Sequence, residues 1–186
     1  MIQKRPSWDD LFMSIANSAA SRSACIHYSI GAVFVDENHR IISIGYNGPS
    51  SCDINCSEAG YCVKIDGDPI TGKIKRCNGA HAEMNAIVNC GNTMRLSGST
   101  LYTSVFPCYD CMKVLNNAGI KKIIYAENYQ RLIDGKKGEK EVEAEALELA
   151  IKRGIICEQH STPNNKIAET PIVLNEIETP KNEKRF

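Results

Sequence analysis

Two short motifs contain side chains that bind metals and transfer protons. In the first, NGAHAEMNAI, His81 and Glu83 are two positions apart at the predicted start of a helix. In the second, PCYDC, Cys108 and Cys111 are three positions apart at the predicted start of another helix. Cysteines with this spacing can direct their sulfurs to one metal, and the positive end of the helix dipole favours their thiolate forms. With His81 they would give a tetrahedral zinc three protein ligands and leave its fourth position open, which is typical of catalytic sites.

Glu83 is then not needed as a ligand. We expect its carboxylate to lie against a water molecule and to take the proton of that water as the oxygen attacks the amidine carbon of a base. It would then deliver protons to the ring nitrogen and to the departing amine. Two other interpretations stay open, namely a structural Cys3His zinc site with a further cysteine and a redox-active CxxC pair. A redox pair would leave His81 and Glu83 without a role.

The first half of the chain contains the elements that lead to His81. Apolar residues recur at helical spacing over residues 7–22, with Ser7 as a predicted N-cap. The β-branched runs IGAVFVD and RIISIGYN predict an antiparallel hairpin. Residues 47–80 are rich in Gly, Asn, Ser, Asp and Cys and lack sustained periodicity, and so long a loop needs a clamp or a function. A predicted helix then begins at His81 and ends near Cys90.

The second half alternates between predicted strands and helices. STLYTSV is a strand, a helix begins with Pro107 and stops at Gly119, and IKKIIYAE is the next strand. An acidic helix over about 138–153 and a last strand in RGIICEQ complete the pattern, which predicts a mixed α/β sheet with parallel pairs. We expect one domain over residues 1–160, with 47–80 as a Cys-rich inserted loop, and a polar tail over residues 161–186.

Composition makes some classes of partner improbable. The 22 Lys and Arg residues balance 22 Asp and Glu residues, so net charge gives no general attraction to nucleic acid or to an anionic membrane surface. The start, MIQKRPSWDD, lacks an apolar h-region, and no run approaches the roughly 18 apolar residues of a membrane span. We therefore expect a cytoplasmic protein without a membrane segment. The nine cysteines are then expected to be metal ligands, reactive thiols or small buried hydrophobes rather than disulfides.

The order H-x-E followed by P-C-x-x-C is the signature of the zinc-dependent nucleobase deaminases. A longer string of motifs makes the resemblance more specific, because the chain resembles the deoxycytidylate (dCMP) deaminases of the cytidine deaminase-like superfamily over roughly residues 5–130. The motifs that carry this resemblance are, in order, RPSWDDLFMSIA, SRSAC, IGAV, GYNGPS, NC and GYC, AHAEMNAI, FPCYDC and NAGIKKIIYAE.

The resemblance implies a three-layer α/β/α fold with a five-stranded mixed sheet. It also implies zinc-dependent hydrolysis of dCMP to dUMP and ammonia, a reaction that supplies deoxynucleotide for dTMP synthesis, in a homo-oligomer, often a hexamer, regulated by dCTP and dTTP. By the same resemblance, Asn47 contacts the sugar hydroxyl of the substrate, the backbone N–H of Ala82 faces the pyrimidine carbonyl, and Tyr129 lies near the nucleotide.

The chain departs from the family just after SRSAC, where relatives often have basic residues and this sequence has His27, Tyr28 and Ser29. A 5′-phosphate needs hydrogen-bond donors or positive charge, and the nearest candidates are Arg22, His27 and backbone N–H groups. The preference among dCMP, dCTP and deoxycytidine therefore stays open.

The other cysteines raise the question of a second metal. Cys56, Cys62 and Cys77 are spaced too irregularly for a zinc ribbon, and spacing alone leaves their role open. The resemblance implies that these three bind a structural zinc with Cys25 as the fourth ligand, and Cys52 is the alternative. Such a site would clamp the long loop to the first helix and offset the cost of ordering it. In total we expect one catalytic and one structural zinc.

Other functions remain open from the sequence. A tRNA adenosine deaminase has the same His, Glu and PCxxC arrangement, although a polynucleotide substrate also needs cations along its backbone, which the neutral net charge does not favour. A guanine, cytosine or cytidine deaminase would not need the Cys-rich loop. From a different class, the chain could be a non-catalytic zinc-binding accessory protein, and the intact Glu83 argues against that interpretation.

Overall fold

A five-stranded sheet forms the centre of the protein in the computed structural model, which describes residues 5–133, 136–141 and 143–160. The strand order is β2-β1-β5-β6-β9. β1 (Gly31–Val35) pairs antiparallel with β2 (Ile41–Tyr46) and with β5 (Thr100–Val105). β6 (Lys122–Glu127) runs parallel to β5 and to β9 (Ile156–Gln159). The predictions of an antiparallel hairpin and of a mixed sheet with parallel pairs are confirmed, and the structure places the hairpin at one edge and the parallel pairs at the other.

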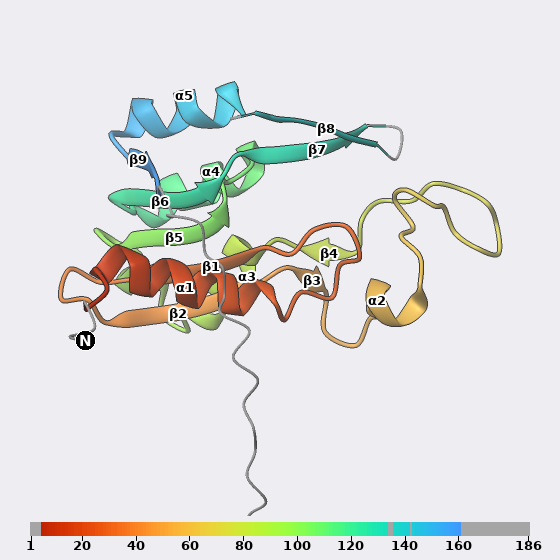
Figure 1. The fold of residues 1–186 in the computed structure, drawn as a ribbon, viewed down its shortest axis with the longest axis horizontal. Helices are drawn as coiled ribbons and strands as arrows, with labels where there is room; N and C mark the ends of the chain where they lie inside the picture. The colour runs from red at the N-terminus through yellow and green to blue at the C-terminus, as the bar shows by residue number, and fades with distance from the viewer. Residues whose placement is uncertain (1–4, 134–135, 142, 161–186) are drawn as a thin grey trace, which may run out of the picture.

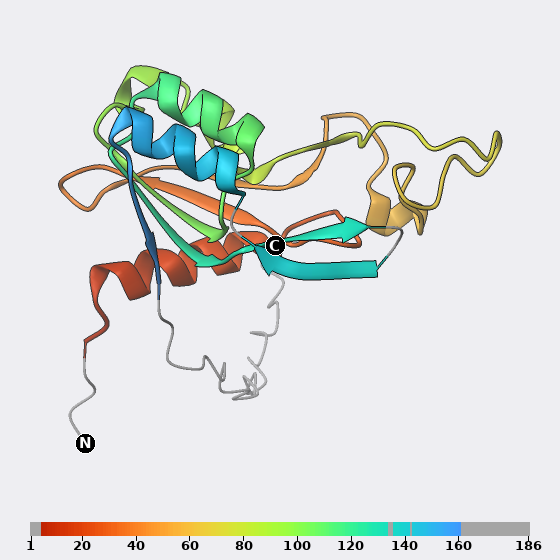
Figure 2. The same ribbon diagram turned by 90° about the horizontal axis from the view of Figure 1, so that it is seen from above.

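Helices cover both faces of this sheet. α1 (Trp8–Ala20) lies on one face, and α3 (Ala82–Asn89), α4 (Tyr109–Ala118) and α5 (Ala144–Arg153) lie on the other (Figures 1 and 2). The three-layer α/β/α architecture is therefore as expected. Among the described residues, no helix has both the length and the apolar character needed to cross a membrane.

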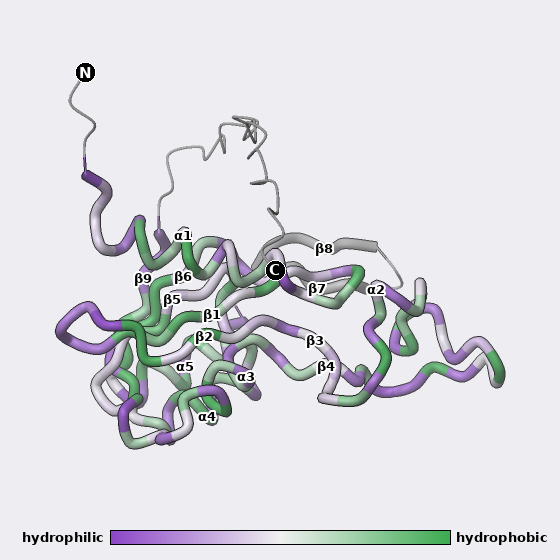
Figure 3. The backbone as a smooth tube through the Cα atoms, turned by 90° about the horizontal axis from the view of Figure 1, so that it is seen from below, coloured by the Kyte–Doolittle hydropathy of each residue, from purple (hydrophilic) through white to green (hydrophobic). Residues whose placement is uncertain are grey.

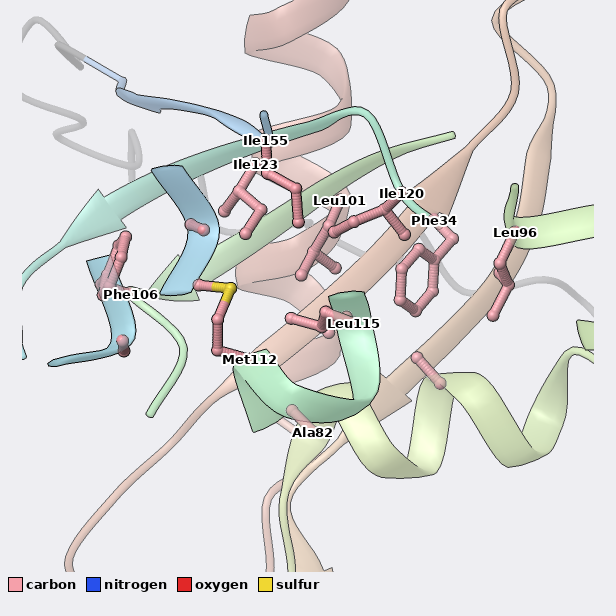
Figure 4. Packing of buried hydrophobic residues seen from close by; sticks show 14 of the residues in the cluster. Phe34, Ala82, Leu96, Leu101, Phe106, Met112, Leu115, Ile120, Ile123 and Ile155 are labelled. Carbon is pink, nitrogen blue, oxygen red and sulfur yellow. The ribbon is translucent and has the colours of Figure 1, made fainter. Parts of the chain in front are cut away.

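Strand β1, which lies between β2 and β5, contributes to two hydrophobic clusters because its side chains alternate between the faces of the sheet. Ala32 and Phe34 join the larger cluster beneath α3, α4 and α5, whereas Val33 and Val35 join the smaller one beneath α1. All five residues of β1 are buried, as expected for a strand covered on both faces. In the larger cluster the side chains of α4 pack against those of β5 and β6 (Figure 4). Hydrophobic residues concentrate in the sheet, whereas hydrophilic and hydrophobic stretches alternate along the loop that carries α2 (Cys56–Ala59) (Figure 3).

The starts of α1 and α4 show how the sequence sets helix boundaries. α1 begins after Ser7, whose hydroxyl accepts a hydrogen bond from the backbone N–H of Asp10. The carboxylate of Asp10 accepts one from the backbone N–H of Ser7 in return, which completes a capping box. The predicted cap is confirmed. Pro107 was expected within the first turn of α4, but that helix begins at Tyr109 with Cys108 as its N-cap. Gly119 ends α4 in the left-handed conformation, as predicted.

α3 lies very close to strand β2. A Cβ atom placed on Gly45 would be 2.3 Å from both the backbone oxygen of Ala82 and the backbone nitrogen of Ala86, so only glycine fits there. The side-chain amides of Asn85 and Asn89 donate hydrogen bonds of 2.8 Å to backbone oxygens of β2. The edge strand therefore fixes the position of the helix that begins directly after His81.

The Cys-rich segment 47–80 extends away from the sheet (Figure 1). Its two ends meet, because β3 (Gly48–Pro49) pairs antiparallel with β4 (Gly79–Ala80). Between them lies one short helix, α2 (Cys56–Ala59), and the rest is irregular. A 3-10 turn, η1 (Thr93–Leu96), links α3 to β5.

The prediction of an acidic helix over 138–153 is wrong for its first residues, up to 143. β7 (Tyr129–Ile133) and β8 (Lys136–Glu141) form an antiparallel hairpin there, and α5 begins only at Ala144. The sequence has Asp-Gly between the paired residues Ile133 and Lys136, and this dipeptide is a strong signal for a two-residue hairpin connection. The predicted tail over 161–186 lies outside the described residues, and the boundary of the domain at residue 160 stays a prediction.

Candidate functional site

The starts of two helices meet at the residues singled out from the sequence. His81 is the N-cap of α3, Cys108 is the N-cap of α4, and Cys111 lies in the first turn of α4. Neither N-cap side chain caps its own helix. Instead, His81 Nδ1 lies 3.4 Å from Cys108 Sγ and 3.3 Å from Cys111 Sγ. The structure thus brings together the three predicted metal ligands.

These three side chains fit a zinc ion. Their ligand atoms all lie within 4.8 Å of one another, and no other such group occurs among the described residues. Zinc bonds of about 2.3 Å to sulfur and 2.0–2.1 Å to nitrogen place neighbouring ligand atoms of a tetrahedron about 3.6 Å apart, close to the separations found here. The ring nitrogen that faces the sulfurs is Nδ1, so it is the atom that would bind the metal.

The pKa values of the two thiols shift in opposite directions. A hydrogen bond from Cys111, aided by His81, lowers the pKa of Cys108 to about 4. The same hydrogen bond, together with burial, raises the pKa of Cys111 far above its usual value. The hydrogen bond to Cys108 raises the pKa of His81. A metal cation shared by both sulfurs favours deprotonation of both, so metal binding and proton release are coupled at this site.

Glu83 lies in the first turn of α3 and is only 4% exposed. Burial raises the pKa of its carboxyl, against the opposing effects of hydrogen bonds that include one from Cys111. The carboxyl is therefore adjacent to a predicted ligand, and it lines the same cavity as His81 and Cys108. A carboxyl whose pKa is raised toward neutrality suits a group that accepts a proton and then returns it.

The cavity in front of these residues has a volume of about 620 Å³, which is a usual size for a small-molecule site. Of the residues expected to contact substrate, Asn47 and Tyr129 line it. The ring of Tyr129 stacks on that of Tyr28 with centroids 5.7 Å apart. The side chain of Ala82 is fully buried in the core and does not line the cavity, so only its backbone N–H at the start of α3 can serve the predicted role.

Asn47 also has a structural task. Its Oδ1 accepts a hydrogen bond of 2.8 Å from the backbone N–H of Ile30, and its Nδ2 donates one of 2.9 Å to the backbone oxygen of Tyr28. These bonds hold the loop after α1 against the end of β2. A side-chain amide has a second N–H and a second lone pair, so these bonds leave capacity for a ligand.

The four cysteines expected to bind a structural zinc all line this cavity, and the alternative ligand Cys52 does not. The four lie close enough to influence one another, because burial and then the charges of the other three raise the pKa of Cys56. In the described part of the chain, however, only the His81 group brings three ligand atoms within 4.8 Å. The four thiols are thus neighbours whose sulfurs are spread more widely. The four cysteines are Cys25, Cys56, Cys62 and Cys77.

Two residues of the site escaped the sequence analysis. Lys64 is the only Lys or Arg among the described residues that line the cavity, and its charge opposes the rise in the pKa of His81. It lies in an irregular loop whose path no periodicity predicts. Glu143 contacts the start of α4 through the N–H of Tyr109, across 34 positions of sequence.

The two candidate phosphate ligands have different surroundings. The guanidinium of Arg22 lies over the ring of Tyr46, 6.0 Å from its centroid, and Arg22 does not line the cavity. His27 does line the cavity, and its Nε2 is buried without a hydrogen-bond partner among the described residues.

Comparison with known proteins gives a consistent picture. The family model for the cytidine and deoxycytidylate deaminase zinc-binding region matches residues 6–127. The deoxycytidylate deaminase of Schizosaccharomyces pombe is 32% identical over 164 residues, covering 88% of this chain and 47% of that protein. The ComE operon protein 2 of Bacillus subtilis is 38% identical, covering 68% of this chain and 63% of that protein. This chain thus spans about half the length of the fungal relative.

Among solved structures, the dCMP deaminase of cyanophage S-TIM5 in complex with dCMP and dUMP matches with a TM-score of 0.62 at 24% sequence identity. The match covers 85% of this chain and 100% of that one. The sheet and its helices therefore have the cytidine deaminase-like fold that the motifs implied. The family match and the His81, Cys108 and Cys111 group together support zinc as the metal.

Proposed function

Because the chain belongs to the cytidine and deoxycytidylate deaminase zinc-binding family, we propose that it hydrolyses dCMP to dUMP and ammonia. One observation carries the proposal, namely that a buried carboxyl, Glu83, lies beside a His/Cys/Cys metal group in a nucleotide-sized cavity. Zinc held by His81, Cys108 and Cys111 would supply Lewis-acid activation of a water molecule.

Glu83 performs the proton transfers in this proposal. Its carboxylate accepts a proton from the attacking water, whose oxygen forms a bond to the ring carbon that bears the amine. The carboxyl then gives this proton to the ring nitrogen. It next takes the remaining proton from the newly added hydroxyl group and passes it to the amine, so the carbonyl of the product forms as the bond from carbon to nitrogen breaks and ammonia leaves. Burial raises the pKa of Glu83, which makes its carboxylate a stronger base for the proton of the water.

The substrate contacts in this proposal come from the family resemblance. Asn47 contacts the sugar hydroxyl, the N–H of Ala82 faces the pyrimidine carbonyl, and Tyr129 lies beside the nucleotide. We assign the 5′-phosphate to Lys64 and His27. Within the described part of the chain, Lys64 is the only Lys or Arg that lines the cavity, and the buried Nε2 of His27 has no hydrogen-bond partner there. An ammonium group and an imidazole N–H both bind phosphate oxygens well.

A second, structural zinc belongs to the same proposal. Cys25, Cys56, Cys62 and Cys77 line one wall of the cavity, and a cation would draw their sulfurs together and clamp the loop 47–80. Metal analysis of the purified chain should give two zinc ions per chain, and the Cys77→Ser variant should give one. A wild-type content of one would reject the structural site while leaving the catalytic site intact.

The remaining features come from the family resemblance. We propose a cytoplasmic hexamer regulated by dCTP and dTTP, which supplies dUMP for dTMP synthesis. Sedimentation with and without each nucleotide measures the assembly directly. A monomer that neither nucleotide affects would contradict the regulated hexamer.

The test of the function is ammonia release from the zinc-loaded protein with dCMP, dCTP, deoxycytidine and a tRNA anticodon stem-loop offered separately. Turnover of dCMP well above that of deoxycytidine supports the proposal. Preferred turnover of the RNA or of deoxycytidine would leave the proposed zinc chemistry standing but would contradict the assignment of dCMP as the substrate. If no substrate reacted, the chain would be a zinc-binding accessory protein.

A further inference from the structure

The N-terminus of α4 obtains its hydrogen-bond acceptor from another helix. A helix start leaves several backbone N–H groups without an intrahelical partner, and the side chain of the N-cap residue usually accepts from one of them. In α4 that residue is Cys108, whose sulfur faces His81 instead and makes no cap bond. The acidic residue in the first turn of α4, Asp110, forms an ion pair with Lys113, with 2.6 Å between Oδ1 and Nζ.

Glu143 fills this need. Its Oε2 accepts a hydrogen bond of 2.6 Å from the backbone N–H of Tyr109, the first residue of α4. Glu143 is the N-cap of α5, yet its side chain makes no cap bond to its own helix. The bond is short and involves a carboxylate, and hydrogen bonds of this kind are stronger than those between neutral groups.

Packing between the two helices holds Glu143 in place. Ala146 and Ala150 of α5 are fully buried, and the side-chain amide of Asn116 in α4 donates a hydrogen bond of 3.2 Å to the backbone oxygen of Leu149. α4 and α5 lie side by side on one face of the sheet (Figure 2). The carboxylate therefore comes from a rigid neighbour and not from a mobile surface group.

The geometry points to a role for this bond at the metal site. The N–H that Glu143 holds belongs to the peptide unit between Cys108 and Tyr109. The oxygen of the same unit accepts a hydrogen bond of 2.9 Å from the backbone N–H of Met112. With both sides of this peptide held, the Cα atom of Cys108, which lies in the same peptide plane and carries the side chain, is held with it.

We propose that Glu143 is a positioning residue, which directs the Cys108 sulfur toward the metal by fixing the peptide that follows it. The inference rests on the proposed function, because it takes Cys108 as a ligand of zinc. Groups that orient metal ligands typically contribute 10- to 100-fold to metal affinity or activity. The bond lies near the surface, so we expect an effect of about tenfold, at the lower end of that range.

The test compares Glu143→Ala, Glu143→Gln and Glu143→Asp with the control Glu145→Ala, an exposed residue in the first turn of the same helix. Two readouts need no substrate, namely hydrogen–deuterium exchange of peptides that contain the Tyr109 amide and the rate at which zinc passes to a chromophoric chelator. In Glu143→Ala we expect faster amide exchange and zinc loss about tenfold faster. The Gln variant keeps an acceptor oxygen and should recover most of the difference, and the Asp variant is too short and should resemble Ala.

Kinetics separate positioning from substrate contact. With dCMP, Glu143→Ala should lower kcat about tenfold and leave KM within about twofold, and Glu145→Ala should match the wild type. Amide exchange and zinc loss unchanged in Glu143→Ala, or changed equally in Glu145→Ala, would overturn the proposal, as would a higher KM with an unchanged kcat. If the Ala variant does not fold, the Asp variant carries the same comparison. A chain that deaminates no nucleotide but shows the expected zinc loss would overturn the proposed function and leave this inference standing.

Discussion

The close contact between Gly45 and α3 makes Gly45→Ala the most informative single substitution in the fold. The added Cβ would lie 2.3 Å from backbone atoms of Ala82 and Ala86, where ordinary contacts are at least 3.4 Å. Helix α3 would have to move about 1 Å away from β2, because backbone atoms cannot rotate aside as a flexible side chain can. His81 and Glu83 lie at the start of this helix and would move with it.

The expected cost is at the upper end of the range for overpacking, about 3 kcal/mol, because both obstacles are backbone. For a chain of this length that cost corresponds to a fall in Tm of about 6–12 °C. Activity should fall more steeply, by roughly 100-fold, because a misplacement of about 1 Å is enough to spoil a catalytic arrangement.

Thermal unfolding followed by circular dichroism, together with zinc content, measures both effects. The matched control is Gly48→Ala in the same GYNGP segment, where the nearest atom to a new Cβ is Ala24 Cβ at 3.6 Å. The control should unfold within about 1 kcal/mol of the wild type. A Gly45→Ala protein that keeps its Tm within about 2 °C and its full zinc content would show that α3 is not held as tightly as described.

Three further predictions concern catalysis, specificity and pH. Glu83→Gln should lower kcat by about 100- to 10,000-fold while zinc content stays at the wild-type level, and substantial activity with bound zinc would contradict the role of this carboxyl. Lys64→Met should lower kcat/KM for dCMP by about 10- to 100-fold and leave deoxycytidine unaffected, whereas Lys73→Met in the same loop should change neither; equal losses on both substrates would argue against a phosphate contact. Hydrogen bonds from Ser7 hold the pKa of Asp10 below 3.8, so the stability from its ionised form is present above pH 3.8 and lost as pH falls through the lowered pKa. The difference in Tm between the wild type and Asp10→Asn should therefore shrink in acid, and a difference that is constant with pH would contradict this.

Local signals in the sequence were enough for most of the fold. The Ser7 cap, the alternating β1 and β2 runs and the Gly119 stop each depend on neighbouring residues, and the structure confirms all three. The hairpin of β7 and β8 was missed although the sequence has Asp-Gly between the paired residues Ile133 and Lys136, because the apolar positions further along suggested a longer helix. In that stretch turn chemistry decides the structure and helical periodicity does not.

The residues of the candidate site likewise fall into those that local sequence signals predicted and those that they did not. His81, Glu83, Cys108 and Cys111 were predicted because each motif starts a helix, and helix starts are readable in sequence. Lys64 and Glu143 were not predicted, because each reaches the site through tertiary packing that no local pattern encodes. The four cysteines proposed to bind the structural zinc are an intermediate case. Their proximity was expected, but the arrangement of the three that lie in the loop 47–80 depends on how an irregular segment folds.

The most direct test of the central claim is to follow the oxygen atom. The zinc-loaded protein would be given dCMP in water enriched in oxygen-18, and mass spectrometry would measure how much oxygen-18 the product contains. Our account predicts dUMP with one heavy oxygen in the base, an equal amount of ammonia, and almost no product from Glu83→Gln. Formation of no dUMP, or of dUMP without the label, would contradict hydrolysis at this site.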